Sequence, residues 1–384
     1  MRSVRPLDVP RGQDAVTANA GRVVVALLMA LGGGALGACA TGRPLEVKKV
    51  DAVAQPPSNV AVYMKITRED GQPVSLVAAD FKVFEDGKQL PSKKVKRALL
   101  PVQYAVDRFV FVVVDLSGPL VDSEYLSTLQ DAVASLADRI GKEARLGLSA
   151  FDGDGLVPFV SFDDTDAKAG LVAMRKFRPR SRNIDLWGTF IGALDALDKA
   201  QKQSPVPHRQ ATLILVTDRR DKAGRHSQDQ AMARIQKSSA DVYVIGIGDT
   251  INREELEPLG KTAALFAAEP RDLEKPFVEL ADRIESQLGQ DYLFSYCSPQ
   301  KPGKKSEKHE VELRIATSQW HGSVEHEFST KGFTGDSCDA AAKPEFRTAS
   351  TKASAAAKGD SDDTRPKKKK PKPDDEEKES EPES

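Results

Sequence analysis

The feature that most constrains the fold lies between residues 107 and 290, where apolar runs of strand length alternate with amphipathic stretches of helix length. Residues 109–114 and 213–216 are uninterrupted apolar runs, and residues 123–140 carry apolar side chains at helical spacing up to Gly141. Uninterrupted runs are typical of strands that are buried on both faces. Strands that alternate with helices predict an α/β domain with a doubly wound, mostly parallel, Rossmann-like sheet over residues 107–290.

The remaining elements of this region follow the same alternation. We expect further helices over residues 167–176, 190–200, 228–237, 253–259 and 273–288, and further strands over 211–216, 242–247 and near Leu265. Residues 145–151 and 156–162 flank an Asp-Gly-Asp-Gly turn, which predicts a hairpin. The hairpin would place one antiparallel strand at the edge of the sheet.

The flanking segments, 59–105 and 291–338, have the texture of short strands. Val60, Val62 and Met64 alternate with small or polar residues, and the alternation returns after Gln290. Each segment is too short to bury a stable core by itself. We therefore predict a small accessory β region in which the strands of the two segments pair with each other.

Residues 1–38 have the plan of an export signal. Four arginines precede an apolar run over residues 23–30, and the whole run is too short for a permanent membrane span. The run ends at Leu36-Gly37-Ala38-Cys39, which resembles the bacterial lipobox. The resemblance implies cleavage before Cys39 and diacylglycerol on its thiol; the alternative is a secretory signal cleaved after Ala38 or Ala40. Either way, we expect the chain to leave the cytoplasm.

The lipobox resemblance also implies a place for the protein. Several acyl chains on one cysteine anchor a protein more firmly than a single chain does. In lipoproteins, an alanine such as Ala40 directly after the lipidated cysteine implies the outer membrane. We therefore expect a lipid-anchored protein of the cell envelope, in the outer membrane.

Two further segments lack hydrophobic periodicity. Residues 39–58, which include Pro56 and Pro57, are predicted to form a tether between the lipid anchor and the folded body. Residues 339–384 consist mainly of Ala, Lys, Pro, Asp, Glu and Ser, and bury too little apolar surface to offset ordering. We predict a disordered, charged tail there.

Besides Cys39, the chain has two cysteines, Cys297 and Cys338. An even pair in an exported protein favours a disulfide, because that compartment permits oxidation. The alternative is two free thiols.

Charge and motifs exclude several classes of function. The net charge is −1, with the basic and acidic blocks gathered near the C-terminus, so no overall field attracts nucleic acid. The sequence contains no nucleophile elbow, phosphate loop or dinucleotide fingerprint. We therefore expect no enzyme activity.

Polar residues gather where the predicted strands end. Asp115 follows the run 109–114, and Asp218 follows the strand 211–216. In doubly wound sheets, ligands bind beyond the carboxyl ends of the strands. The loop before the helix at 190–200 adds Thr189 as a third candidate.

These three places resemble the segments of a metal-ion-dependent adhesion site of the von Willebrand factor A family. The matching segments are Asp115-Leu116-Ser117-Gly118-Pro119, Trp187-Gly188-Thr189 and Val216-Thr217-Asp218. The resemblance implies the family fold over residues 107–290 and a divalent ion held by Asp115, Ser117, Thr189 and Asp218. It also implies recognition of another protein, whose carboxylate completes the site.

One position departs from the family pattern. Pro119 stands where the family has a second serine, so water would replace one ligand of the ion. Mg²⁺ and Mn²⁺ suit oxygen ligands of this kind and keep several waters. Two alternatives stay open: a site that holds the ion, and a site in which Asp115 and Asp218 only cap their loops.

The sequence therefore favours a binding module that recognises an envelope or surface protein and is attached to the membrane through its lipid anchor. The first alternative is a metal-free structural scaffold in an envelope assembly. A weaker alternative is an envelope metal-dependent hydrolase, because no general base is evident beside the candidate site.

Overall fold

The protein is represented by a computed structural model that describes residues 42–117, 125–151, 155–164, 166–179, 184–218, 221–249, 251–301, 307–334 and 336–346. The predicted export signal with Cys39, and the end of the predicted tail from residue 347, lie outside the described residues. Among the helices of the described ranges, none has the length and apolar character needed to cross a membrane.

A six-stranded sheet occupies the middle of the chain. Its strands are β6 (Val106–Asp115), β7 (Arg145–Phe151), β8 (Leu156–Val160), β9 (His208–Thr217), β10 (Asp241–Ile247) and β11 (Ala263–Ala267). The strand order is β11-β10-β9-β6-β7-β8, and all neighbours are parallel except β7 and β8. The predicted α/β class, the mostly parallel sheet and the antiparallel edge strand are confirmed.

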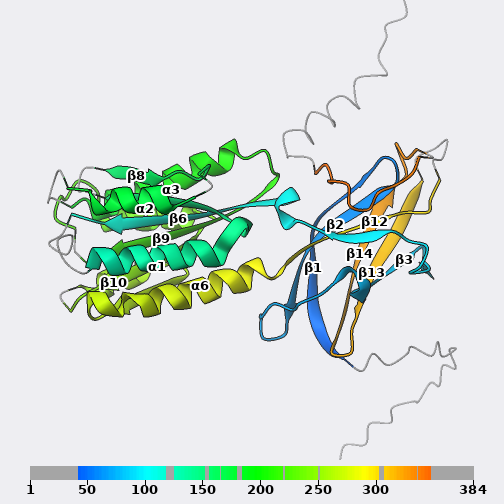
Figure 1. The fold of residues 1–384 in the computed structure, drawn as a ribbon, viewed down its shortest axis with the longest axis horizontal. Coiled ribbons are helices and arrows are strands. Elements are labelled where there is room, and N and C mark those ends of the chain that lie inside the picture. The colour runs from blue at the N-terminus through cyan, green and yellow to red at the C-terminus, as the bar shows by residue number, and fades with distance from the viewer. Residues whose placement is uncertain are drawn as a thin grey trace, which may run out of the picture. The chain divides into compact units, whose positions relative to one another are not determined.

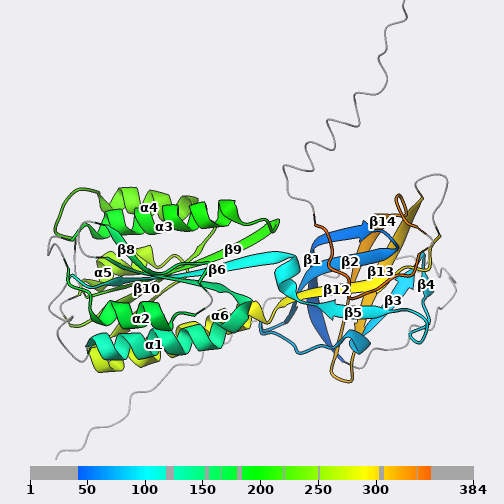
Figure 2. The same cartoon turned by 45° about the horizontal axis from the view of Figure 1, so that its top comes forward.

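Helices cover both faces of this sheet (Figures 1 and 2). They are α1 (Tyr125–Ile140), α2 (Lys168–Arg175), α3 (Leu186–Gln203), α4 (Gln228–Lys237), α5 (Arg253–Leu256) and α6 (Glu274–Leu288). The short 3-10 helices are η1 (Ala78–Asp80), η2 (Val102–Tyr104), η4 (Gly141–Glu143), η5 (Glu257–Leu259) and η6 (Pro270–Leu273). Helices α1, α2 and α6 pack on one face, and α3, α4 and α5 on the other.

The central strand β6 shows why the apolar runs are uninterrupted. Val110, Val112 and Val114 belong to the core under α1 and α6, whereas Phe111 and Val113 belong to the core under α3. Successive side chains of a strand point to opposite faces. A strand covered by helices on both faces therefore needs apolar residues at every position.

The flanking segments, together with residues 43–55, form a second β region of eight strands. They are β1 (Arg43–Gln55), β2 (Asn59–Arg68), β3 (Phe81–Glu85), β4 (Lys88–Gln89), β5 (Arg97–Leu100), β12 (Asp291–Cys297), β13 (Lys308–Ala316) and β14 (Trp320–Ser329). The strand order is β4-β3-β13-β14-β1-β2-β12-β5. Strand β12 pairs with β2, and β13 pairs with β3, so the predicted pairing of the two segments is confirmed.

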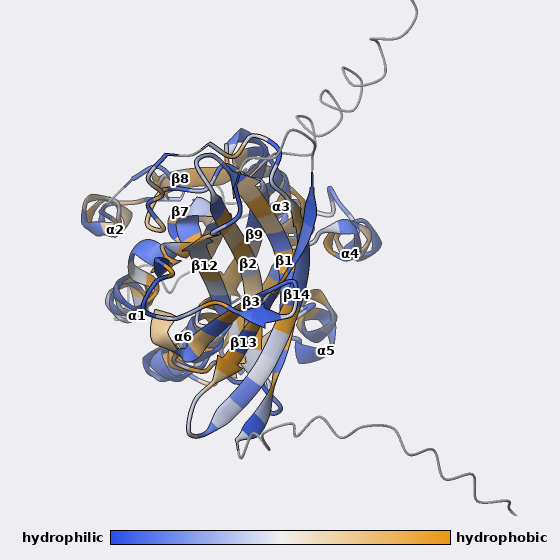
Figure 3. Cartoon of the chain, turned by 90° about the vertical axis from the view of Figure 1, so that its right-hand side faces the viewer, coloured by the Kyte–Doolittle hydropathy of each residue, from blue (hydrophilic) through white to orange (hydrophobic). Residues whose placement is uncertain are grey.

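One core joins the two halves of this β region, which are β4-β3-β13-β14 and β1-β2-β12-β5. Strands β14 and β1 pair over only two residue pairs, and beyond them the side chains of both halves pack into one cluster. Val62 and Met64 of β2 meet Phe294 of β12 and Leu313 of β13 in this cluster. Much of β2 has the colour of hydrophobic residues in Figure 3. The region therefore owes its stability to burial that neither segment achieves alone.

The predicted tether is wrong over most of its length, because residues 43–55 form β1, which pairs with β2 from Leu45 to Gln55. A β-bulge between Lys49 and Asp51 interrupts this pairing. Val47 packs inward before the bulge and Ala52 after it, so the inward positions change from odd to even numbers. An extra residue reverses the side-chain alternation of a strand. The sequence of β1 therefore shows no single period.

The predicted disorder from residue 339 is also too extensive. Ala340 and Pro344 are buried, and Phe346 packs against the cluster that contains Ala61 and Tyr63. The bond Cys297–Cys338 holds this segment to the end of β12, as the even pair of cysteines predicts. The described fold therefore continues to residue 346.

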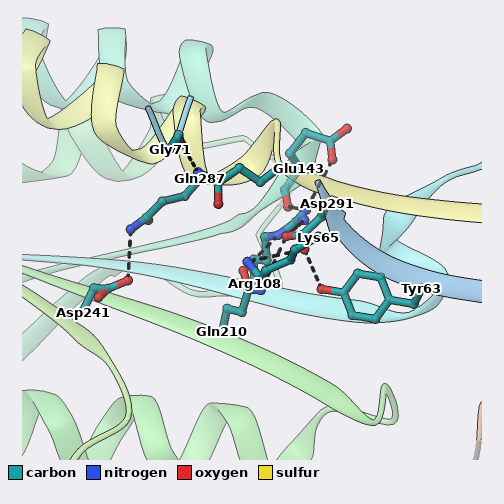
Figure 4. Close-up of polar contacts among 10 residues, drawn as sticks. Tyr63, Lys65, Gly71, Arg108, Glu143, Gln210, Asp241, Gln287 and Asp291 are labelled. Carbon is teal, nitrogen blue, oxygen red and sulfur yellow. Dashed lines mark hydrogen bonds and ion pairs between the residues drawn. The ribbon is translucent and has the colours of Figure 1, made fainter. Parts of the chain in front are cut away.

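Buried polar groups connect the β region to the six-stranded sheet (Figure 4). Asp291, at the start of β12, accepts hydrogen bonds from Arg108 of β6 at 2.6 Å and from Tyr63 of β2 at 2.9 Å. Lys65 lies 3.4 Å from the same carboxylate. Burial and the charge of Asp291 raise the pKa of Tyr63, so its hydroxyl stays protonated and donates.

Candidate functional site

The candidate site begins where the two central strands end. Strands β6 and β9 are parallel, and Val114 pairs with Val216. The next residues, Asp115 and Thr217, therefore lie side by side at the carboxyl edge of the sheet. Asp218 follows directly, at the first position after β9. The position of these residues agrees with the general rule for ligand sites in doubly wound sheets.

Asp115 is the centre of a buried hydrogen-bond cluster. One carboxylate oxygen accepts from the backbone N–H of Ser117 at 2.9 Å and from its hydroxyl at 2.5 Å. The other oxygen accepts from the hydroxyl of Thr217 at 3.0 Å. Asp115 is 4% exposed and Ser117 is 2% exposed. The carboxylate is therefore held in one orientation by the loop after β6 and by the last residue of β9.

Tyr125 lies close to both aspartates of the site. It is the first residue of α1 and is fully buried. Burial raises the pKa of the Tyr125 hydroxyl well above its usual value, and the charges of Asp218 and Asp115 raise it further. The charges of both carboxylates act on this one hydroxyl. The predicted ligands Asp115 and Asp218 therefore share one electrostatic environment.

Thr189 lies in the first turn of α3. Its hydroxyl donates to the backbone carbonyl of Asp185 at 2.8 Å, and its side chain is buried. The Asp185 side chain caps the helix by accepting from the N–H of Gly188 at 2.9 Å. The second carboxylate oxygen of Asp185 lies 2.7 Å from Nδ1 of His226.

The loop after β9 is attached to the start of α3. Asp221 accepts from the N–H of Leu186 at 2.8 Å, and the N–H groups of Lys222 and Ala223 both donate to the carbonyl of Ile184. With the pair Asp185 and His226, these contacts join the Asp218 loop to the Thr189 helix. The three segments predicted from the sequence are therefore parts of one loop cluster.

The oxygen atoms of these side chains suit a hard divalent cation as ligands. Ser117 and Thr189 donate their hydroxyl protons to protein oxygens, which leaves oxygen lone pairs as the groups they can offer. Carboxylate and hydroxyl oxygens are the ligands that Mg²⁺ and Mn²⁺ prefer. Within the described ranges, no group of three or more His, Cys, Asp and Glu side chains is arranged to hold a metal. An ion here would therefore depend on hydroxyls and water beside Asp115 and Asp218.

Some predicted features lie outside the described residues. These are Gly118 and Pro119 of the first segment. The structure adds residues that the sequence did not predict for the site. Thr217 had a visible signal, because it is a hydroxyl residue between Val216 and Asp218. Asp185, His226 and Tyr125 had none, because their roles depend on contacts between separate loops.

The comparisons with known proteins agree with this fold. The family model of the von Willebrand factor type A domain matches residues 110–282. Domains of this family commonly mediate interactions between proteins. No curated protein matches the chain.

Several solved structures match parts of this chain. Proximal thread matrix protein 1 from the mussel byssus, whose structure has a zinc-occupied MIDAS motif, is 21% identical over 46% of this chain and 48% of its own, with a TM-score of 0.37. A von Willebrand factor type A protein from Catenulispora acidiphila is 13% identical over 76% of this chain and 74% of its own, with a TM-score of 0.39. A PilB minor pilin variant from Streptococcus sanguinis is 10% identical over 64% of this chain and 80% of its own, with a TM-score of 0.37.

The chain spans about half the length of the mussel byssus proteins that it matches. The matched region of the chain contains the whole six-stranded sheet apart from the first residues of β6, together with α1 to α5 and most of α6. Residues 110–282 are therefore a von Willebrand factor type A domain.

Proposed function

We propose that this protein is a lipid-anchored component of the cell envelope whose von Willebrand factor type A domain binds another protein through a divalent ion. The observation that carries the proposal is the cluster at the carboxyl edge of the sheet, where Asp115 is fixed by Ser117 and Thr217. The lipobox ending at Cys39 supports the anchor, and Ala40 favours the outer membrane. The protein is a recognition module and not an enzyme.

The ion site would use four residues of this chain. Asp115 and Asp218 would supply carboxylates, and Ser117 and Thr189 would supply hydroxyl oxygens. Mg²⁺ or Mn²⁺ bound there would offer a coordination position to an acidic side chain of the partner. Because Pro119 removes one hydroxyl, we expect weaker ion binding than a serine at that position would allow.

Calorimetric titration of Mn²⁺ and of Mg²⁺ into the full chain in detergent micelles tests the ion site. Asp115→Asn keeps the shape of the side chain but removes its charge, and it should abolish the heat of binding. Asp138→Ala is the matched control, because Asp138 is an exposed aspartate near the other end of α1. Pro119→Ser should bind more tightly than the wild type. An absence of heat in the wild type would contradict ion binding and favour the metal-free scaffold.

Cross-linking in envelope membranes tests recognition. The wild type should form a cross-linked product with a second protein, and both chelator and Asp115→Asn should remove it. A product that survives both treatments would mean that other surfaces make the contact, as a structural scaffold requires.

A further inference from the structure

The described chain enters the fold at the hairpin between β13 and β14. The N–H of Arg43 donates to the carbonyl of Gln319 at 2.7 Å, and Arg43 pairs with Trp320. A Cβ atom on Gly42 would lie 2.8 Å from the backbone nitrogen of Trp320. Gly42 therefore packs directly against the hairpin, and the backbone is held in place from this residue onward.

Covalent geometry limits how far Cys39 can be from this point. Three residue steps separate Cys39 from Gly42, and an extended chain covers at most roughly 11 Å in three steps. The headgroup layer on each side of a bilayer is several ångströms thick. An acyl chain on Cys39 therefore requires this end of the β region to lie at the membrane surface.

The side chains at this end suit that position. Trp320 is half-buried, and the guanidinium of Arg68 lies 5.9 Å from the centre of its ring. Arg43, Pro44, Glu69 and Asp70 join these two residues around a hollow of about 270 Å³. Tryptophan prefers the interface between water and lipid, and arginine binds phosphate groups.

The charges at this end are balanced. Asp70 lies 3.0 Å from Arg68 and forms an ion pair with it, and Glu69 is exposed beside Arg43 in the same hollow. A balanced set of charges matches a zwitterionic headgroup better than a strongly anionic polymer, which needs an excess of positive charge. The kind of partner that this surface fits is a phospholipid headgroup layer.

We infer that the end of the β region formed by Arg43, Arg68 and Trp320 lies in the headgroup layer of the membrane and fixes how the protein stands on it. The inference rests on the lipid anchor in the proposed function. The anchor alone would hold the protein loosely, whereas the short connection and Trp320 would hold it in one orientation.

Fluorescence quenching tests this inference. The full lipidated chain is placed in vesicles of phosphatidylethanolamine and phosphatidylglycerol whose acyl chains carry bromine. The chain has two tryptophans, and Trp187 is buried in the von Willebrand factor type A domain. The difference between the wild type and Trp320→Phe isolates the emission of Trp320, which should be quenched and shifted to shorter wavelength.

A spacer variant provides the control. Fifteen Gly and Ser residues inserted between Cys39 and Gly42 would add a span of roughly 20 Å, enough for the end to leave the headgroup layer. Quenching of Trp320 should then fall while membrane binding is kept. Equal quenching with and without the spacer, or no quenching in the wild type, would overturn the inference.

Mass spectrometry of the N-terminal peptide distinguishes a failure of the orientation from a failure of the anchor. If Cys39 carries acyl chains but Trp320 is not quenched, only the orientation fails. If Cys39 is not acylated and Cys39→Ser changes nothing in membrane binding, the anchor in the proposed function fails, and the orientation fails with it.

Discussion

The guanidinium of Arg108 lies 2.6 Å from the carboxylate of Asp291, although the two residues are 183 positions apart in the chain. Their side chains are 3% and 0% exposed, so the pair is shielded from solvent (Figure 4). Arg108 belongs to the six-stranded sheet and Asp291 to the β region. The ion pair is therefore part of what connects the six-stranded sheet to the β region.

Removal of Arg108 should weaken the whole fold. Arg108→Met leaves the Asp291 carboxylate buried without its main counter-charge, and we expect the free energy of unfolding to fall by about 3 kcal/mol. Urea denaturation followed by circular dichroism measures the change. Arg283→Met is the control, because Arg283 forms an exposed pair with Glu279 and should change stability by less than about 1 kcal/mol. Equal losses of unfolding free energy in both variants would show that the buried pair stabilises the fold no more than the exposed pair does.

The bond between Cys297 and Cys338 closes a loop with a sequence separation of 41 residues. A cross-link over a loop of this size restricts the unfolded chain, so replacing both cysteines by serine should lower the free energy of unfolding by about 2–4 kcal/mol. Denaturation of the wild type in a reducing agent should give the same value as the double variant. If reduction leaves the denaturation midpoint unchanged, the bond does not stabilise the fold.

Gly188 is a position where a single methyl group should have a large effect. A Cβ atom there would lie 2.3 Å from Oδ2 of Asp185 and 2.6 Å from Nδ1 of His226, the two atoms that pair with each other. Gly188→Ala should therefore separate this pair and lower the free energy of unfolding by about 1–3 kcal/mol.

Gly192, one turn further along α3, is the matched control for Gly188. A Cβ atom on Gly192 would meet nothing within 4 Å, so Gly192→Ala should raise stability by about 0.5–1 kcal/mol through helix propensity. Thermal unfolding compares the two variants. A Gly188→Ala variant as stable as Gly192→Ala would mean that the loops adapt without cost.

The stability of the fold should depend on pH through His326. Burial, and then the positive charge of Lys49, lower the pKa of His326 below its usual value of 6.5. Below that pH the unfolded chain binds more protons at this residue than the folded chain, so stability is lost as the pH falls. Above it, the contribution of His326 is fully present.

Thermal unfolding at about pH 7.5 and about pH 5.5, on either side of the usual histidine pKa, measures this dependence. The Tm of the wild type should fall more between the two values than the Tm of His326→Gln. Parallel falls in the two proteins would assign the pH dependence to other groups.

The sequence alone determined the class of the central domain and the position of its candidate site. Residues 109–114 of β6 and 213–216 of β9 are uninterrupted apolar runs because helices cover both faces of these strands, and this pattern is local. Asp115 and Asp218 could be placed at one edge because parallel strands end on the same side of a sheet. The two flanking β segments could be paired because each is too small to form a core by itself.

Only the tertiary structure decided the contacts that join distant parts of the chain. The alternation in β1 is broken by a bulge, so its place in the sheet depends on pairing with β2. Thr217 reaches Asp115, and His226 reaches Asp185, because strand register and loop packing bring them together. Arg108 and Asp291 meet for the same reason. A local pattern reports which face of an element is buried, but it does not report which distant side chain lies opposite.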